Sequence, residues 1–289
     1  MSSGTMGSGG QRGRVLVTGA TGTTGSRLTE LLVARGTAVT SASRSGTGSH
    51  GTSGVRFDWY DASTYQGALA DVEAVYLIPP VRDPAPQAVM LPFLERARAA
   101  GVRRAVLHSN SVTPAGGPGI GAVHKAIVDM FGEWAVLRPS WFMQNVTGSH
   151  VHAQSIRVTS AIVTAAGNGR AGFVDAGDIA RAAAVALLRP LPVNTDLILT
   201  GPQALSYDEV AAILSEVSGR AITHRNLDPA ELVAYYKDIG VPTPAAQFLP
   251  LMDAVVASGT EDRTTDAVER ITGQPPRSYR EFALAEFRI

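Results

Sequence analysis

The stretch Arg14-Val-Leu-Val-Thr-Gly-Ala-Thr-Gly-Thr-Thr-Gly25 decides the fold. A short apolar run ending in glycine is typical of a buried strand, and residues 26–34 then place Leu28, Leu31 and Leu32 on one face of a helix. Glycines at such a junction let the backbone approach a phosphate, and the helix N-terminus supplies N–H donors. The stretch predicts a dinucleotide-binding loop, with a ligand-free strand–helix turn as the alternative. Its candidate binding residues are Gly19, Thr21, Gly22, Thr23, Thr24 and Gly25.

Strand-like and helix-like segments alternate along the chain after this loop. Apolar runs predict strands at 38–43, 55–59, 74–78, 104–108, 134–137 and 196–200, and helices are expected at 64–69, 87–100, 122–131 and 178–188. This alternation predicts an α/β fold, a Rossmann-type doubly wound parallel sheet with helices on both faces. We expect the dinucleotide-binding domain at 14–150, with a contribution from 172–200, and a smaller, mostly helical substrate-binding region at 201–289.

Composition excludes several classes of function. The 289 residues carry 25 basic and 25 acidic side chains and no cysteine. The balanced charge gives no reason to expect a nucleic-acid partner, and the missing cysteine excludes disulfides and thiolate catalysis. No metal is expected, because His150 and His152 lack enough convergent ligands. No membrane segment is expected either. We expect a cytoplasmic monomer or homodimer acting on a small molecule, with residues 1–13 a disordered Gly/Ser tail.

The end of the second strand indicates which dinucleotide is bound. NAD sites place Asp or Glu there to hold the ribose hydroxyls. This chain has Ser43 and Arg44 at that point and no carboxylate nearby. An acid would repel a 2′-phosphate, whereas an arginine can clamp it with two hydrogen bonds. The pattern favours NADP(H), with Arg44 as a solvated loop residue the alternative.

Several stretches together resemble the NmrA-like branch of the atypical short-chain dehydrogenase/reductases, and most closely its subgroup of ergot-alkaloid iminium reductases. The resemblance runs from about residue 14 to 285. It implies that Asp58 and Trp59 lie near the adenine and that Pro79 lies along the cofactor. The stretches that carry it are Val15–Gly25, Phe57-Asp-Trp59, Val75-Tyr-Leu-Ile-Pro-Pro80, Leu137-Arg-Pro-Ser-Trp-Phe-Met-Gln-Asn145, Val174-Asp-Ala-Gly-Asp-Ile-Ala180 and Ile271-Thr-Gly-Gln-Pro-Pro276.

The resemblance also implies a missing catalytic group. Short-chain dehydrogenases commonly use Tyr-x-x-x-Lys, in which the Lys lowers the Tyr pKa for proton transfer. Here Gly121 stands in the place of the Tyr and Lys125 in the place of the Lys. Lys125 would bind the nicotinamide ribose, and His124 would supply a proton. The alternative for His124 is a polar residue on a helix face.

Three further segments are expected to border the reaction site. Ser109 follows the fifth strand, at the sheet edge where ligands gather. Trp141, Phe142, Gln144 and Asn145 follow the strand at 134–137 and are candidates for the substrate pocket, with core packing of the aromatic residues as the alternative. Helices at 229–240 and 245–259, carrying Tyr236 and Met252, are expected to close over the nicotinamide as a lid.

Together these features predict an NADPH-dependent reductase of a small, activated organic substrate of the iminium, enone or quinone type. Two alternatives stay open: an NADP(H)-binding redox sensor that regulates a partner, and a non-redox cyclase or isomerase on the same fold. Hydrolase chemistry is disfavoured because no Gly-x-Ser-x-Gly motif occurs.

Overall fold

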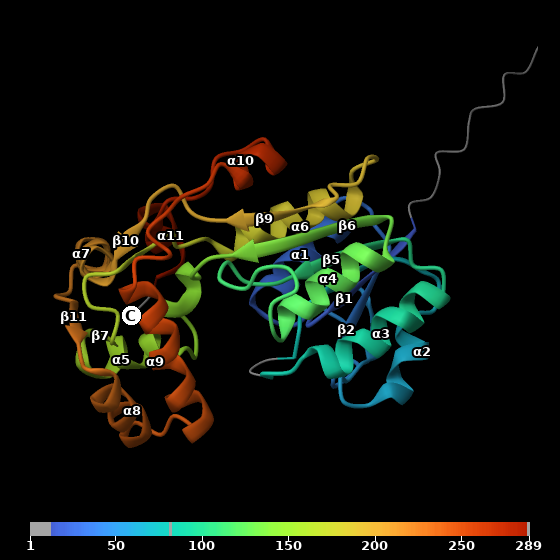
Figure 1. Ribbon diagram of the computed structural model, residues 1–289. Coiled ribbons are helices and arrows are strands. Elements are labelled where there is room, and N and C mark those ends of the chain that lie inside the picture. Colours follow the sequence, from blue (N-terminus) through green and yellow to red (C-terminus); the bar gives the residue numbers. More distant parts are fainter. Residues whose placement is uncertain (1–12, 81–82, 288–289) are drawn as a thin grey trace, which may run out of the picture.

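The computed structural model describes residues 13–80 and 83–287, so the predicted tail lies outside the described residues apart from Gly13 (Figure 1). The main sheet has the strand order β3-β2-β1-β4-β5-β6-β9, and every neighbouring pair is parallel. The order reverses beside β1, which opens a crevice at the carboxyl ends of β1 and β4. This confirms the predicted Rossmann-type doubly wound sheet. The strands are β1 (Arg14–Thr18), β2 (Val39–Ser43), β3 (Ser53–Arg56), β4 (Val72–Leu77), β5 (Arg104–His108), β6 (Glu133–Pro139) and β9 (Thr195–Leu199).

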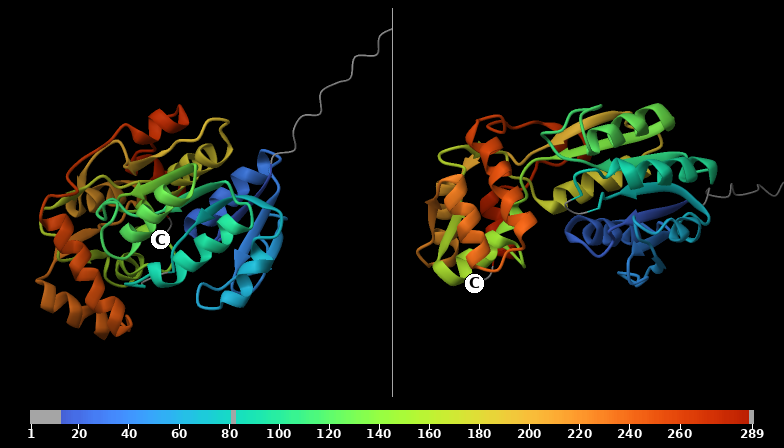
Figure 2. Two further views of the ribbon diagram at one scale, coloured as in Figure 1. Left: turned by 45° about the vertical axis from the view of Figure 1, so that its right-hand side comes forward. Right: turned by 60° about the horizontal axis from the view of Figure 1, so that its bottom comes forward.

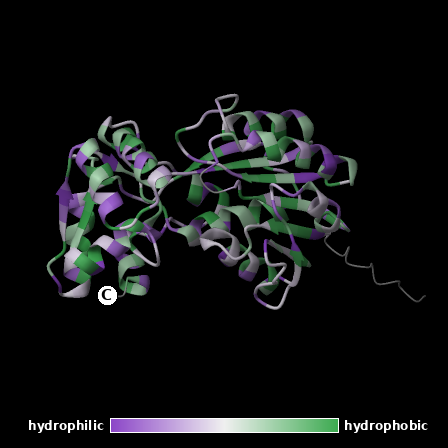
Figure 3. Ribbon diagram, turned by 90° about the horizontal axis from the view of Figure 1, so that it is seen from below, coloured by the Kyte–Doolittle hydropathy of each residue, from purple (hydrophilic) through white to green (hydrophobic). Residues whose placement is uncertain are grey.

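Helices cover both faces of the sheet (Figures 1 and 2). Successive strand residues point to opposite faces, so Val15 and Val17 pack beneath α1 (Thr23–Ala34) and α6 (Ala176–Leu188). Leu16 points the other way, to the core beneath the second helix layer. Figure 3 shows the strands as the hydrophobic centre of this half. The second layer comprises η1 (Ala62–Thr64), α2 (Tyr65–Ala68), α3 (Gln87–Ala99) and α4 (Ile120–Met130).

A smaller lobe lies beside the carboxyl ends of the main sheet (Figure 1). Two small sheets support it: β7 pairs with β11 in parallel, and β8 pairs with β10 in antiparallel orientation. Three hydrogen-bonded capping boxes begin helices here, one of them between Ser206 and Glu209. The lobe contains η2 (Met143–Val146), α5 (Val151–Thr159), β7 (Ala161–Thr164), β8 (Arg170–Ala171), β10 (Leu205–Ser206), α7 (Tyr207–Ser218), β11 (Thr223–Asn226), α8 (Pro229–Asp238), α9 (Thr243–Ala257) and α11 (Tyr279–Glu286).

The chain passes repeatedly between the two halves. The helix α5 and the strand β7 lie in the segment 151–171, which the prediction assigned to neither region, and β7 pairs with β11 of the small lobe. In the opposite sense, α10 (Ala267–Thr272) packs on α6 of the Rossmann half. The domain boundaries at 150 and 201 stay a prediction.

The start of α6 differs from the sequence expectation. The sequence predicts this helix from residue 178, but it begins at Ala176 and its N-cap is Asp175, whose side chain accepts a hydrogen bond from the Gly177 N–H. Asp178 lies one turn further in, fully buried, and accepts the Arg277 N–H at 2.8 Å. None of the described helices is long and apolar enough to cross a bilayer.

Candidate functional site

The glycine loop is packed so tightly against the start of α1 that it leaves no room for a side chain at Gly25. Gly19 has φ of +60°, and its carbonyl oxygen accepts the Gly22 N–H at 2.9 Å. A Cβ on Gly25 would overlap that oxygen and lie 2.8 Å from the Gly19 carbonyl carbon. Gly22 is the N-cap of α1 and provides no side-chain cap. Backbone N–H groups at the helix start are thus left for a ligand, which is the geometry an anion requires.

A hollow of about 290 Å³ lies beside this loop, over the ends of β2 and β3. Six predicted cofactor residues line it: Gly19, Ser43, Arg44, Asp58, Trp59 and Pro79. The Trp59 indole N–H donates to the Ile78 carbonyl at 3.1 Å, which fixes the loop after β3 to the end of β4. Arg44 is exposed, and no described residue forms a hydrogen bond or ion pair with its side chain. Its guanidinium is therefore available to an anionic ligand.

A second hollow, of about 210 Å³, lies between the carboxyl ends of β5 and β6 and the small lobe. Five of the six predicted substrate residues line it: Trp141, Phe142, Asn145, Tyr236 and Met252. The exception is Gln144, whose side-chain oxygen accepts the Ala176 N–H at 3.0 Å and so supports the start of α6. The remaining lining residues are Asn110, Ser111, Val112, Pro139, Ser140, His150, His152, Tyr207, Leu249 and Asp253.

The helices expected to form a lid do line this second hollow, but both are fixed to β7. The Tyr236 hydroxyl on α8 donates to the Val163 carbonyl at 3.2 Å. The Asp253 carboxylate on α9 accepts the Ala165 N–H at 2.9 Å, just beyond the strand. The helices therefore form a wall of the pocket, and whether they move as a lid stays a prediction.

Three polar residues of this pocket were missed by sequence reasoning. Asp253, Tyr207 and His152 are 4%, 2% and 5% exposed. Burial raises the pKa of the Asp253 carboxyl to about 6, raises that of Tyr207 and lowers that of His152. Within the described chain, the Tyr207 hydroxyl and the His152 Nδ1 have no hydrogen-bond partner. No local motif marks these residues, because three separate helices bring them together.

A buried carboxylate holds the sheet end of the pocket in place. Glu261 is 1% exposed and accepts hydrogen bonds from the Ser111 hydroxyl at 2.6 Å and the Ser140 hydroxyl at 3.1 Å. Arg263 donates to its other oxygen at 2.8 Å. Glu261 thus ties the segments after β5 and β6 to the C-terminal part of the chain. Ser109 is buried nearby, but it lines neither of the two hollows.

The predicted catalytic pair on α4 lies away from both hollows. His124 is buried with its ring 6.4 Å from that of Trp134, and burial lowers its pKa. The Lys125 ammonium points to solvent and pairs with Asp129 at 2.8 Å. The geometry gives neither residue a contact with the pocket, so their catalytic roles stay predictions.

Position 121 has no room for the tyrosine of a Tyr-x-x-x-Lys motif. A Cβ on Gly121 would lie 2.5 Å from the Pro114 carbonyl oxygen, because the loop after β5 folds over the start of α4. A different buried phenol is close to the pocket: the Tyr76 hydroxyl lies 2.7 Å from the His108 Nδ1. Burial lowers the pKa of His108 to about 4, and its ring lies 5.8 Å from that of Phe142. This neutral pair supports one wall of the pocket.

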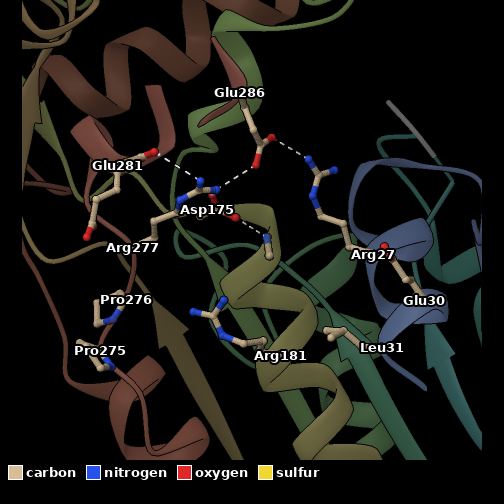
Figure 4. A pocket seen from close by; sticks show the side chains of 11 residues that line it. Arg27, Glu30, Leu31, Asp175, Arg181, Pro275, Pro276, Arg277, Glu281 and Glu286 are labelled. Atoms are coloured by element: carbon tan, nitrogen blue, oxygen red, sulfur yellow. Dashed lines mark hydrogen bonds and ion pairs between the residues drawn. The ribbon is translucent and has the colours of Figure 1, made fainter. Parts of the chain in front are cut away.

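A third hollow, of about 550 Å³, lies between α1, α6 and the C-terminal segment (Figure 4). Its arginines are already paired. Arg277 bridges Asp175 and Glu286, at 2.9 Å to each, and Glu286 also pairs with Arg27 of α1 at 2.8 Å. Arg181 pairs with Asp178. None of the predicted cofactor or substrate residues lines this hollow. Its ion pairs hold α11 against α1 behind the glycine loop.

Comparisons with known proteins find relatives in sequence and in fold. Residues 15–121 match the model of the NAD dependent epimerase/dehydratase family. An uncharacterized oxidoreductase of Bacillus subtilis is 43% identical over 273 residues, covering 94% of each chain. Agroclavine dehydrogenase of Claviceps purpurea is 36% identical over 284 residues, covering 94% of this chain and 97% of the relative. An NADPH-dependent quinone oxidoreductase of Escherichia coli, solved with NADPH, has the same fold: TM-score 0.80, 23% identity, 93% and 98% coverage.

Proposed function

Because this chain belongs to the NmrA-like branch of the atypical short-chain dehydrogenase/reductases and is an oxidoreductase that uses a nicotinamide cofactor, we propose that it is an NADPH-dependent reductase of small, activated organic electrophiles. One observation carries the proposal. A hollow lined by the predicted cofactor residues and a separate aromatic pocket lie along the same edge of one sheet, at the carboxyl ends of its strands. Ligands of open α/β sheets bind at this edge.

The residues divide into two groups with different tasks. The glycine loop would hold the pyrophosphate on backbone N–H groups, and Arg44 would clamp the 2′-phosphate. Asp58, Trp59 and Pro79 would border the adenine end. In the pocket, Trp141, Phe142 and Met252 would exclude water around the electrophile, while the amides of Asn110 and Asn145 orient it. When bound, NADPH supplies a hydride.

An activated electrophile fits the acid–base groups of the site. Position 121 has no room for a tyrosine, and burial raises the pKa of Tyr207 and of Tyr236, so both phenols hold their protons strongly. Such phenols donate hydrogen bonds but are poor proton donors. Iminium ions, enones and quinones accept hydride without a strong acid at that moment, whereas simple ketones need one.

The test is NADPH oxidation measured with one substrate of each class: a cyclic iminium ion, a quinone, an enone and an unactivated cyclic ketone. We expect turnover with at least one activated substrate and background rates with the ketone. Efficient reduction of the ketone would contradict the proposal. Tight, selective NADPH binding without turnover of any substrate would favour the redox-sensor alternative.

Arg44→Ala should remove most of the preference for NADPH over NADH. A charge-assisted hydrogen bond contributes roughly 1.5–3 kcal/mol, or about ten-fold to over a hundred-fold in affinity. NADH has no 2′-phosphate, so its affinity should be unchanged. Fluorescence titration of both cofactors measures this, with the exposed Arg35→Ala as a control for a lost surface charge. Equal binding of the two cofactors by the parent protein would show that the assignment is wrong.

Met252→Ala should raise the KM for substrate about ten-fold while the affinity for NADPH stays within two-fold. The side chain lines the substrate pocket and not the cofactor hollow, and removing it opens apolar space there. Leu251→Ala is a matched control, because Leu251 is the neighbouring residue of α9 but 65% exposed. Equal losses of NADPH binding and substrate binding would place Met252 outside the substrate site.

A further inference from the structure

The substrate pocket contains a buried carboxylate that has no counter-ion among the described residues. Asp253 lines it from α9 and is 4% exposed. Its single hydrogen bond comes from the Ala165 N–H at 2.9 Å, and no described Lys, Arg or His forms an ion pair with it. None of the described Lys and Arg residues lines the pocket. A carboxylate in this setting is costly to ionise, because burial removes its hydration without supplying a positive partner.

The side chains around Asp253 do not compensate its charge. Tyr207 on α7 and Tyr236 on α8 are neutral phenols, and His152 on α5 stays neutral because burial lowers its pKa. His150, at the start of α5, also lines the pocket. The Tyr207 hydroxyl and the His152 Nδ1 have no partner among the described residues. The pocket therefore presents a negative charge and unsatisfied polar atoms inside an aromatic enclosure.

The hydrogen bond that Asp253 makes to the protein does not require a charge. An asparagine oxygen would accept the same Ala165 N–H in the same position, without the cost of burying an ion. The Asp253 carboxylate pairs with no described cation and lines a pocket that is open to ligands. This is the arrangement that selective binding of a cationic ligand requires.

Building on the reductase function proposed above, we propose that Asp253 is the specificity-determining residue of this pocket: its carboxylate selects a substrate that carries a positive charge, such as an iminium ion, over a neutral quinone or enone. The carboxylate attracts the cationic nitrogen, and the rings of Trp141, Phe142 and Tyr236 surround its apolar body. A quinone or enone would leave the buried charge unpaired.

This choice also fits the missing proton donor. Hydride reduction of an iminium ion forms one C–H bond, and the π electrons of the C=N⁺ bond become the lone pair of the product amine. The hydride comes from the NADPH of the proposed function, which becomes NADP⁺. No proton is consumed, so the reaction needs no acidic residue at the position of Gly121.

The test compares two redox-inert probes of the same shape, benzyltrimethylammonium and neopentylbenzene, which differ in having N⁺ or carbon at one position. Binding to the full-length protein saturated with NADPH is measured by titration. We expect the parent to bind the cation about ten-fold to a hundred-fold more tightly. Asp253→Asn should abolish that preference and leave the NADPH affinity unchanged. Asp238→Asn, which removes an exposed carboxylate from the same lobe, should retain it.

Two results would overturn this role of Asp253: equal binding of the two probes by the parent, or a preference for the cation that persists in Asp253→Asn. Neither measurement needs turnover, so a protein that binds the cation through Asp253 but reduces nothing would refute the reductase function alone. Conversely, turnover of quinones without selection of the cation would refute the role of Asp253 alone. An unchanged NADPH titration of the variant confirms that it is folded.

The preference should also depend on pH. The pKa of Asp253 is about 6, so the carboxyl gains its proton, and the pocket loses its charge, as the pH falls through that value. The preference for the cationic probe should therefore be full at pH 8 and lost near pH 5. The phenols of Tyr207 and Tyr236 and the imidazole of His152 stay neutral in this interval. Repeating the measurement with His150→Asn checks that the loss of preference comes from Asp253.

Discussion

Gly25→Ala is expected to weaken NADPH binding by at least a hundred-fold. The new Cβ would overlap the Gly19 carbonyl oxygen, 2.8 Å from the carbonyl carbon and 3.1 Å from the Ala20 Cα. These are backbone atoms, so relief requires the glycine loop to move away from α1. That movement displaces the N–H groups that would hold the pyrophosphate, and each charge-assisted hydrogen bond lost costs roughly 1.5–3 kcal/mol.

The measurement is a fluorescence titration of NADPH, with circular dichroism to confirm the fold. Gly67→Ala serves as the control, because a Cβ at Gly67 meets nothing within 4 Å. We expect the control to bind NADPH as the parent does. A Gly25→Ala protein with parental affinity would show that the cofactor phosphates lie elsewhere.

Asp253→Asn is expected to stabilise the protein by about 1–3 kcal/mol at pH 8. The pKa of this carboxyl rises from 3.8 to about 6 on folding, and each unit corresponds to about 1.4 kcal/mol. Because the folded-state pKa is the higher one, the folded protein binds the proton more tightly. The ionised group therefore opposes folding: the cost is absent below pH 4, grows between pH 4 and 6, and is complete above pH 6.

Chemical denaturation at pH 4, 6 and 8 tests this expectation. The gain of the variant should be near zero at the lowest pH and largest at the highest. Asp238→Asn, at an exposed site, should change the free energy of unfolding by less than about 0.5 kcal/mol. A variant less stable than the parent at pH 8 would give the Asp253 charge a structural role. The expected gain in stability with loss of selectivity is the pattern typical of residues kept for function.

The elements whose signals are local could be predicted from the sequence. The run before Gly19 and the glycines after it define β1 and its turn to α1, and the apolar runs that follow give the strands of the main sheet. Ser206 and Glu209 sit three residues apart, which is enough to predict their capping box. Each of these signals depends only on residues that are close in sequence, so it predicts the element without knowledge of how the chain packs.

The elements that depend on distant partners could not be predicted. The strand β7 pairs with β11, about sixty residues later, and β11 is the polar segment Thr-His-Arg-Asn, which carries no strand signal. The start of α6, predicted at residue 178, lies at Ala176. Asp175 and Asp178 both suit a helix start, and in the structure the Asp175 side chain caps the helix.

The residues of the candidate site divide in the same way, into those that local sequence predicts and those whose position depends on distant packing. The residues expected at the cofactor hollow lie on one loop and on strand ends whose positions follow from the topology. Asp253 instead lies on a helix between apolar residues, where an acid is usually a solvated side chain. Only the packing of α9 against β7 turns it into the pocket.

The repeated passage of the chain between the halves limits how the enzyme can change its specificity. Pocket residues come from 110–112, 139–145, 150–152, 207, 236 and 249–253, and α6 and β9 of the Rossmann half lie between these segments in sequence. No single cut releases a substrate-binding module that could be exchanged for another, as happens in proteins with consecutive domains. New substrate preferences must therefore arise by point substitutions among the residues that line the existing pocket.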